Sequence, residues 1–233
     1  MKCAPAPAKI NLALAVGSIR DDGLHELTSV FQRIDIVDSI TVDHVQASGS
    51  SRIEVKGYLG DTLVGGALGA IADATGFEGT LRARVEKRIP VAAGLGGGSA
   101  DAGVALRLAH EQLGAPLSEA KVRELAFGLG ADVPFFLTAG PQLVEGAGER
   151  LSALEIPQDY WVVIALPDGV EKPFTGEIYR RFDEAGADRG YESRRSSLLA
   201  SLGASMRPVA LARLPGNDLA PFTGSSALAQ ELR

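Results

Sequence analysis

The chain has 233 residues, 45% of them apolar and 22% charged, with a formal net charge of −6. This size and composition suit one or two buried cores, and dispersed lysines and arginines argue against non-specific nucleic-acid binding. Its single cysteine, Cys3, cannot form an internal disulfide, and no cysteine and histidine spacing suggests a zinc site. Because no apolar run approaches membrane length and the start lacks a signal pattern, we expect a cytoplasmic protein.

The first part of the chain reads as strands followed by helices. Apolar alternation predicts strands over 9–17, 27–36, 39–46, 52–56 and 80–86, and Leu81, Ala83 and Val85 share one face of the last of these. Helical spacing predicts helices over 63–75, 99–113 and 118–129, and one more strand follows over 141–145. We expect these elements to form a first domain over residues 1–146.

The remaining residues, 147–233, are expected to form a smaller α+β domain. The run 160–166 predicts a strand, and segments 175–184, 195–202, 206–211 and 228–233 read as helical. The basic residues Arg189, Arg194 and Arg195 are expected in a solvated loop, and His44 and His110 are expected to be structural.

A glycine-rich segment, Lys87 to Asp101, is the most informative part of the sequence. It places four glycines and a serine between a predicted strand and a predicted helix, an arrangement that can turn several N–H groups toward one anion. A Walker A loop needs a Lys-Ser or Lys-Thr pair after its last glycine, and a dinucleotide fingerprint needs a third spaced glycine; neither pattern is present. The segment predicts a site for a di- or triphosphate, and a turn without a ligand is the alternative.

Three further polar residues each have a structural and a functional interpretation. Lys9 lies in an apolar strand, where its charge needs a partner or ligand unless it ends in solvent. Asp132 lies in a short turn, where a lone aspartate commonly caps a helix. Ser99 follows the glycines and could cap the helix or bind Mg²⁺ or a phosphate oxygen.

Three ordered segments, Pro7–Asn11, Pro90–Ala100 and Leu129–Phe135, together resemble the GHMP small-molecule kinases over residues 5–222. Within that superfamily, the chain is similar to the family that phosphorylates 4-diphosphocytidyl-2-C-methyl-D-erythritol on its 2-hydroxyl, in the non-mevalonate isoprenoid pathway. The resemblance implies a two-domain α+β fold with an N-terminal domain like domain 2 of ribosomal protein S5. It also implies ATP and Mg²⁺ as cofactors, and phosphotransferase activity with an alcohol acceptor.

The resemblance also implies roles for particular residues. Lys9 and Asp132 would form the catalytic pair, with Asn11 near the substrate and Ser99 as a metal ligand. The nucleotide would contact a set of residues in and before the glycine-rich loop: Lys87, Pro90, Gly94, Leu95, Gly96, Gly97, Gly98, Ser99 and Ala100. A solvated strand end is the alternative for Lys87.

Recognition of the cytidine end would involve His25, Phe174 and Thr175. Leu24 stands where the resembling enzymes carry an aromatic residue that stacks on the cytosine. This departure leaves open another GHMP kinase, such as one acting on homoserine or mevalonate. A turn histidine without a ligand is the alternative for His25.

The end of the chain departs from the family as well. The usual third glycine-rich segment is missing, and Thr223–Ala227 is read as a chance match. We therefore expect either a C-terminally truncated or a divergent member, and a nucleotide-binding module without turnover is a third functional alternative. The expected partners are ATP and the small-molecule acceptor, with no nucleic acid or membrane, and the chain is expected to be a monomer or weak homodimer.

Overall fold

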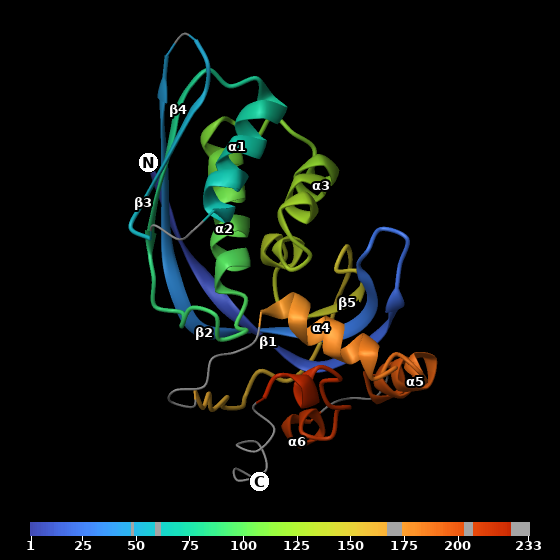
Figure 1. Ribbon diagram of the computed structural model, residues 1–233. Helices are drawn as coiled ribbons and strands as arrows, with labels where there is room; N and C mark the ends of the chain where they lie inside the picture. Colours follow the sequence, from blue (N-terminus) through green and yellow to red (C-terminus); the bar gives the residue numbers. More distant parts are fainter. Residues whose placement is uncertain (48, 59–61, 167–173, 203–206, 225–233) are drawn as a thin grey trace. The chain divides into compact units, whose positions relative to one another are not determined.

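The computed structural model describes the chain except for residues 48, 59–61, 167–173, 203–206 and 225–233 (Figure 1). Its contacts divide into two compact units: residues 1–10 and 33–139 form the first unit, and residues 11–32 and 140–233 form the second. The division at residue 146 into family domains stays a prediction. Among the described helices, none is long and apolar enough to cross a membrane.

The first unit is built on four strands. β1 (Lys2–Ile19) pairs with β2 (His25–Gln46), and both strands continue into the second unit. β4 (Gly79–Glu86) pairs antiparallel with β2 over residues 39–46 and parallel with β3 (Arg52–Lys56). The prediction of two strands over 27–36 and 39–46 was wrong, because β2 runs through Asp38 without a break. The carboxylate of Asp38 is fully buried but hydrogen-bonded, so its charge does not interrupt the strand.

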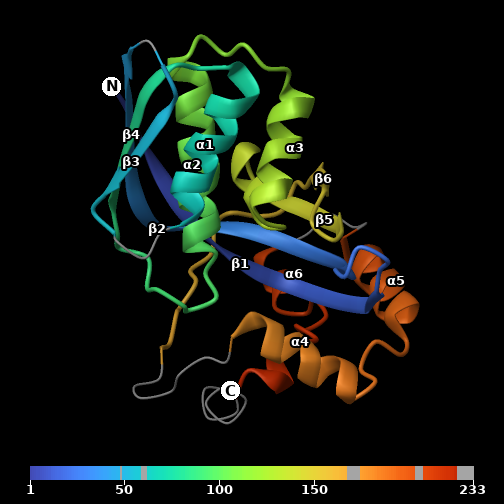
Figure 2. The ribbon, with the colours of Figure 1, turned by 45° about the horizontal axis from the view of Figure 1, so that its top comes forward.

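Three helices cover one face of these strands in the first unit (Figures 1 and 2). They are α1 (Leu63–Thr75), α2 (Gly97–Gln112) and α3 (Glu119–Leu129), close to the predicted ranges. The predicted apolar face of β4 is confirmed, since Leu81, Ala83 and Val85 are all buried. The core of the unit lies between these helices and the strands. Packing against this core sets the position of the first turn of α2.

A short 3-10 helix, η1 (Val133–Leu137), packs tightly against α2. Its Phe135 and Phe136 side chains are buried. The contact is possible because position 103 is a glycine: a Cβ there would lie 2.8 Å from Cβ of Phe136 and 3.2 Å from the carbonyl oxygen of Val133. Gly103 thus sets the distance between α2 and the turn that begins with Asp132.

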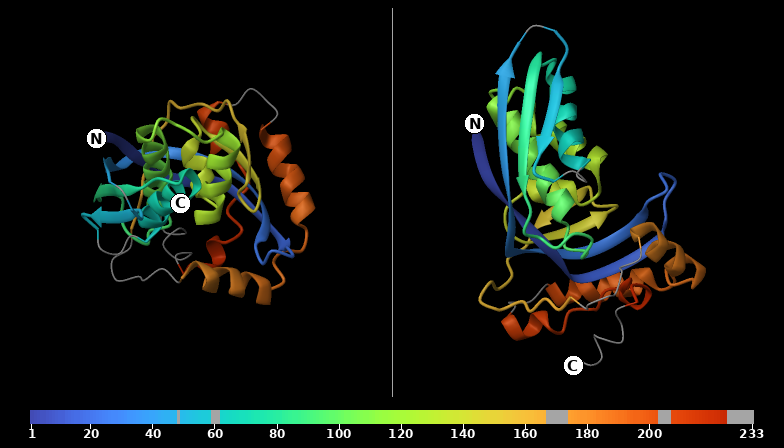
Figure 3. Two further views of the ribbon diagram at one scale, coloured as in Figure 1. Left: turned by 90° about the horizontal axis from the view of Figure 1, so that it is seen from above. Right: turned by 60° about the vertical axis from the view of Figure 1, so that its left-hand side comes forward.

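The second unit combines parts of β1 and β2 with a hairpin and several helices. β5 (Gln142–Gly146) pairs antiparallel with β2 over residues 27–31, and β6 (Arg150–Ala153) pairs antiparallel with β5. The helices are α4 (Thr175–Glu184), α5 (Tyr191–Leu202), α6 (Pro208–Leu211) and the 3-10 helix η2 (Ala220–Phe222). The two longer helices, α4 and α5, are the orange helices of Figure 3. One apolar cluster comprises Ala13, Val30, Ile156, Leu198, Leu211 and Leu214.

Several predictions for the second unit need correction. Residues 160–166 form neither strand nor helix, and Trp161 is 95% and Val163 90% exposed. The residues favour a strand intrinsically, but a strand also needs a neighbouring backbone to bond, and none in the described chain pairs with them. α5 starts at Tyr191, four residues before its predicted start at 195. Residue 206 and residues 228–233, predicted to be helical, lie outside the described residues.

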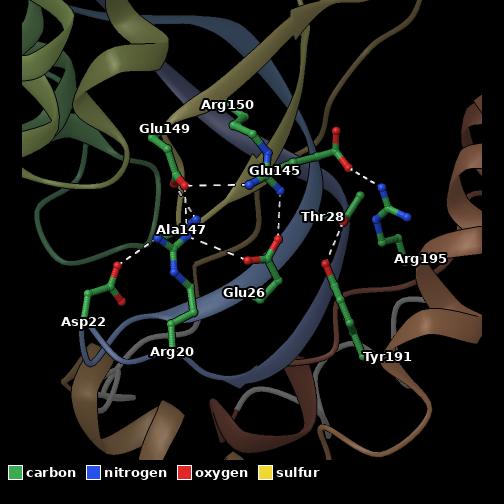
Figure 4. A network of polar contacts seen from close by, with 10 residues as sticks. All are labelled: Arg20, Asp22, Glu26, Thr28, Glu145, Ala147, Glu149, Arg150, Tyr191 and Arg195. Atoms are coloured by element: carbon green, nitrogen blue, oxygen red, sulfur yellow. Dashed lines mark hydrogen bonds and ion pairs between the residues drawn. The ribbon is translucent and has the colours of Figure 1, made fainter.

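Of the arginines predicted to lie in a solvated loop, Arg189 does lie in an exposed turn, whereas Arg194 and Arg195 lie on α5 and are bonded to carboxylates. Arg195 donates to Glu145 at 2.8 Å (Figure 4), and Arg194 to Asp218 at 2.8 Å. Figure 4 also shows Arg20 and Arg150 bonded to carboxylates near the β5–β6 turn. These arginines therefore stabilise the second unit, and the sequence could not show their acidic partners.

Gly103→Ala should lower the free energy of unfolding by about 1–3 kcal/mol, because the added methyl group overpacks the contact with η1. Gly69→Ala is the matched control, since Gly69 also lies inside a helix and nothing lies within 4 Å of its ideal Cβ. We expect that variant to be more stable by about 0.5–1 kcal/mol, from the gain in helix propensity. Urea unfolding of both variants measures this; a similar shift in both would contradict the role of Gly103.

Candidate active site

The glycine-rich segment lines a pocket in the first unit with a volume of about 330 Å³. Its lining residues include eight predicted nucleotide contacts: Lys87, Pro90, Gly94, Leu95, Gly96, Gly97, Gly98 and Ser99. Six further lining residues were not predicted: Tyr58, Thr62, Leu63, Val91, Ala92 and Ala93. Ala100 is fully buried and its N–H donates to the carbonyl of Gly96 at 2.8 Å, so it is placed in the helix core.

The loop reverses direction through residues in the left-handed region. Ala92, Gly94 and Gly96 have φ values of 60°, 77° and 68°. Gly96 is the N-cap residue of α2, so the helix begins two residues earlier than predicted and Ser99 lies in its first turn. The reading of Ser99 as the N-cap is therefore wrong. The N–H groups of this first turn have no acceptor within the helix, and they carry the positive end of its dipole.

Lys9 reaches the loop through its backbone and its side chain. Its N–H donates to the carbonyl of Leu95 at 2.9 Å. A Cβ on Gly96 would lie 2.9 Å from Cγ of Lys9 and 3.4 Å from the ring of Phe136. Only a glycine at position 96 therefore permits both the left-handed turn and the close approach of the lysine.

The ammonium of Lys9 forms an ion pair with Asp132, with 3.1 Å between Nζ and Oδ2. The lysine side chain is 7% exposed and that of the aspartate 34%. The reading of Lys9 as a solvated strand end is thus wrong. Asp132 occupies the N-cap position of η1, but its side chain makes no capping hydrogen bond. One carboxylate that is open to solvent therefore lies beside a buried ammonium at the edge of the glycine-rich loop.

Lys87 lies between two fully buried carboxylates. Its Nζ donates to Asp38 at 2.5 Å and to Asp101 at 2.7 Å. Asp38 also accepts hydrogen bonds from the backbone N–H groups of Arg88 and Ile89, which open the loop. The cluster therefore joins β2, the end of β4 and the first turns of α2, and the solvated reading of Lys87 is wrong.

These contacts shift the pKa values of the three groups. Burial raises the pKa of Asp101 to about 7, against the lowering effect of Lys87. Burial also opposes the charged forms of Asp38 and Lys87, but hydrogen bonds outweigh it. Lys87 and the N–H groups of Arg88 and Ile89 lower the pKa of Asp38, and Asp101 and Asp38 raise the pKa of Lys87. Because two carboxylates already face its ammonium, Lys87 offers little free charge to a ligand.

The residues predicted at the cytidine end lie in the second unit. Nε2 of His25 is 2.8 Å from Oδ1 of Asp183, and its ring stacks on Tyr179 with 4.6 Å between centroids. Both partners lie on α4, which begins with Thr175 after the exposed Phe174. Leu24 is 41% exposed. The structure therefore brings His25 against α4, the helix that carries the other predicted contacts at its start.

Of three further polar residues near the site, Asn11 was predicted from the sequence, whereas Asp38 and Asp101 were not. Asn11 donates to Ser29 at 2.9 Å, so its amide is held by a strand neighbour. Asp38 and Asp101 were not predicted, although each is a charge inside an apolar run, which is the one signal for a buried ion pair. Their common partner, Lys87, could not be identified because 49 residues separate it from Asp38.

Residues 62–140 match the family model described as the GHMP kinases N terminal domain. A 4-diphosphocytidyl-2-C-methyl-D-erythritol kinase of Symbiobacterium thermophilum is 39% identical over 197 residues, which cover 84% of this chain and 69% of the relative. One of Desulfitobacterium hafniense is 40% identical over 93% of this chain and 72% of the relative. The chain belongs to this kinase family.

Solved structures agree with that assignment. The crystal structure of a 4-(cytidine 5'-diphospho)-2C-methyl-D-erythritol kinase superposes with a TM-score of 0.66 at 31% identity, covering 100% of this chain and 81% of that one. A mevalonate kinase, at 10% identity and a TM-score of 0.60, shares the fold. The predicted α+β GHMP kinase fold is confirmed. The matched region spans 59% of the length of a relative from Geobacter sp. and 69–72% of the lengths of the two relatives named above.

Membership of a kinase family makes ATP the expected phosphoryl donor, and the loop fits a triphosphate. The glycines at 96 and 97 let the loop backbone lie close to Lys9 and Ile89, where a Cβ would clash, and the start of α2 supplies N–H donors. No cluster of three or more His, Cys, Asp or Glu side chains in the described chain could hold a metal. Ser99, the metal ligand that the family resemblance implies, lies in the first turn of α2 and lines the pocket.

Asp38→Ala should lower the free energy of unfolding by about 3 kcal/mol, because it removes one partner of a buried ion pair and the acceptor of two backbone donors. Glu54→Ala is the control, since it breaks an exposed pair with Arg82. That variant should lose less than about 1 kcal/mol. Urea unfolding measures both values, and equal losses would show that the buried cluster does not stabilise the loop.

Proposed function

We propose that this chain transfers the γ-phosphoryl group of ATP to the 2-hydroxyl of 4-diphosphocytidyl-2-C-methyl-D-erythritol. The observation that carries the proposal is the ion pair between Lys9 and Asp132 beside the glycine-rich loop, in a chain of this kinase family. Phosphoryl transfer requires little covalent chemistry from the protein. It needs a positioned hydroxyl and a cation placed against the developing negative charge.

The loop would hold the phosphates of ATP. Gly97, Gly98 and Ser99 present backbone N–H groups at the start of α2. Lys87 would act indirectly, because its ammonium is bonded to Asp38 and Asp101 and so sets the shape of the loop. This refines the predicted role of Lys87 as a nucleotide contact.

Asp132 would orient the acceptor hydroxyl and accept its proton. The carboxylate is partly exposed and so can meet a substrate. Lys9 would hold that carboxylate in place and stabilise the phosphoryl group during transfer, because its buried ammonium is poorly screened by water. The pair can serve both functions since the side chain of Lys9 lies against Gly96 of the loop.

Ser99 is the residue that we infer to contribute an oxygen ligand to Mg²⁺. When bound, the metal would neutralise charge on the phosphate oxygens. Ser99 suits this function because it does not cap α2 and it lines the pocket.

Recognition of the cytidine end would use the surface around His25. Its ring is held by Asp183 and Tyr179, which leaves the ring fixed in orientation. Leu24 offers apolar contact without an aromatic face, and Phe174 and Thr175 begin the helix that carries both partners of His25.

The proposal is tested by ADP release with Mg²⁺-ATP and a panel of acceptors: 4-diphosphocytidyl-2-C-methyl-D-erythritol, homoserine and mevalonate. We expect turnover with the cytidine compound only, and phosphate attached to its methylerythritol part by mass spectrometry. Turnover with homoserine or mevalonate instead would assign the chain to another GHMP activity. Binding of ATP with no transfer to any acceptor would support the nucleotide-binding module.

Asp132→Asn serves as the inactive control in the same assay. It should lower kcat by about 100-fold or more, because proton acceptance and ion pairing are both lost, while ATP still binds. Asp73→Asn changes an exposed aspartate on α1 in the same way and should leave kcat within about 2-fold of the wild type.

A further inference from the structure

Arg33 lies on β2 and directs its guanidinium at the end of η1. Its Nη2 donates to the carbonyl oxygens of Phe135 and Thr138, the latter at 3.1 Å, and is 3.4 Å from the hydroxyl of Thr138. The guanidinium carbon lies 4.0 Å from the ring centroid of Phe135 and 5.9 Å from that of Phe136. Neither the motifs nor the proposed chemistry accounts for this arginine.

The acceptors of Arg33 belong to the C-terminal end of the 3-10 helix. Such an end carries partial negative charge, and the carbonyl of Phe135 already accepts the backbone N–H of Thr138 at 3.2 Å. A further hydrogen bond stabilises this end of η1, because the hydroxyl of Thr138 donates to the carbonyl of Phe135 at 2.7 Å. A cation that bonds two of these oxygens and stacks on the adjoining ring holds the end of η1 at several points.

The opposite end of the same helix is Asp132. η1 has five residues, Pro134 restricts its backbone, and the N–H of Val133 is bonded to Gly130 at 3.0 Å. So short a helix moves as one piece. A displacement at the carbonyl of Phe135 would therefore shift the carboxylate of Asp132 relative to Lys9.

We propose that Arg33 is a positioning residue for Asp132: it clamps the far end of η1 and so fixes the carboxylate in place against Lys9. This inference rests on the proposed function of Asp132. Gly103 supports η1 from the side of α2, and Arg33 supplies the polar attachment at its end.

The clamp requires a guanidinium and not merely a positive charge. A planar group can bond two carbonyls and stack on Phe135 at once, whereas a lysine ammonium offers a single charged point. Burial lowers the pKa of Arg33 to about 10, so the group stays protonated at neutral pH.

The test compares Arg33→Met and Arg33→Lys with Arg84→Met, which removes an exposed arginine from β4. Both Arg33 variants should lower kcat per folded molecule by about 10-fold to 100-fold and leave the KM for ATP within about 2-fold, since only the geometry of Asp132 changes. Arg84→Met should match the wild type. A wild-type kcat in Arg33→Lys, or a parallel change in kcat and the KM for ATP, would overturn the proposal.

Hydrogen exchange gives a readout that does not depend on turnover. In the Arg33 variants, the amides of Val133 and Thr138 should exchange at least 10-fold faster, while those in the middle of α2 keep their rates. Unchanged exchange at both amides would overturn the clamp even if the wild type proves inactive. A wild type without ADP release would instead count against the proposed function, whatever the exchange shows.

Discussion

A buried ammonium group is the constraint on which the site depends. Lys9 is 6% exposed in the first unit, where an unpaired charge would cost several kcal/mol. Its ammonium forms an ion pair with Asp132 at 3.1 Å, and the pair can form only because position 96 carries no side chain. The turn of η1, the packing of Gly103 and the contacts of Arg33 all serve to bring that carboxylate to the lysine.

The first unit contains two buried lysine clusters of different character. Around Lys87, both carboxylates are fully buried and the ammonium is satisfied within the protein. Beside Lys9, the carboxylate of Asp132 is partly open to solvent. A cluster whose charges are all buried and paired stabilises the backbone around it. A carboxylate that is partly exposed can instead lose its bound water and contact a substrate. The same residue types thus shape the loop in one place and are available for chemistry in the other.

Local features of the fold were predictable from the sequence. The helices over 63–75 and 118–129 and the buried face of β4 follow from periodicity. The spacing of apolar residues within a single element is enough to predict which of its faces is buried. The glycine-rich loop and its serine are likewise a contiguous signal. Lys9 and Asp132 were identified through the family resemblance, and their proximity in the structure agrees with that reading.

Long-range pairings were not predictable. The strand propensity of residues 160–166 says nothing about whether a partner strand lies beside them, and in the described chain none does. Asp38 and Asp101 are charges within apolar runs, but the sequence did not show that both contact Lys87. Arg33 is similar, since its acceptors are backbone atoms about 100 residues away, with separations of 102 and 105. A sequence shows that a buried charge needs a partner, but only the fold identifies it.

A double-mutant cycle on kcat tests whether Lys9 and Asp132 act as one unit. Lys9→Met, Asp132→Asn and the double variant would be compared at saturating ATP and acceptor, each corrected for its folded fraction. The account predicts that the double variant is about as impaired as the worse single variant, because either change disables the pair. If the fold-loss of kcat in the double variant equals the product of the two single fold-losses, the two residues act independently and do not form a catalytic pair.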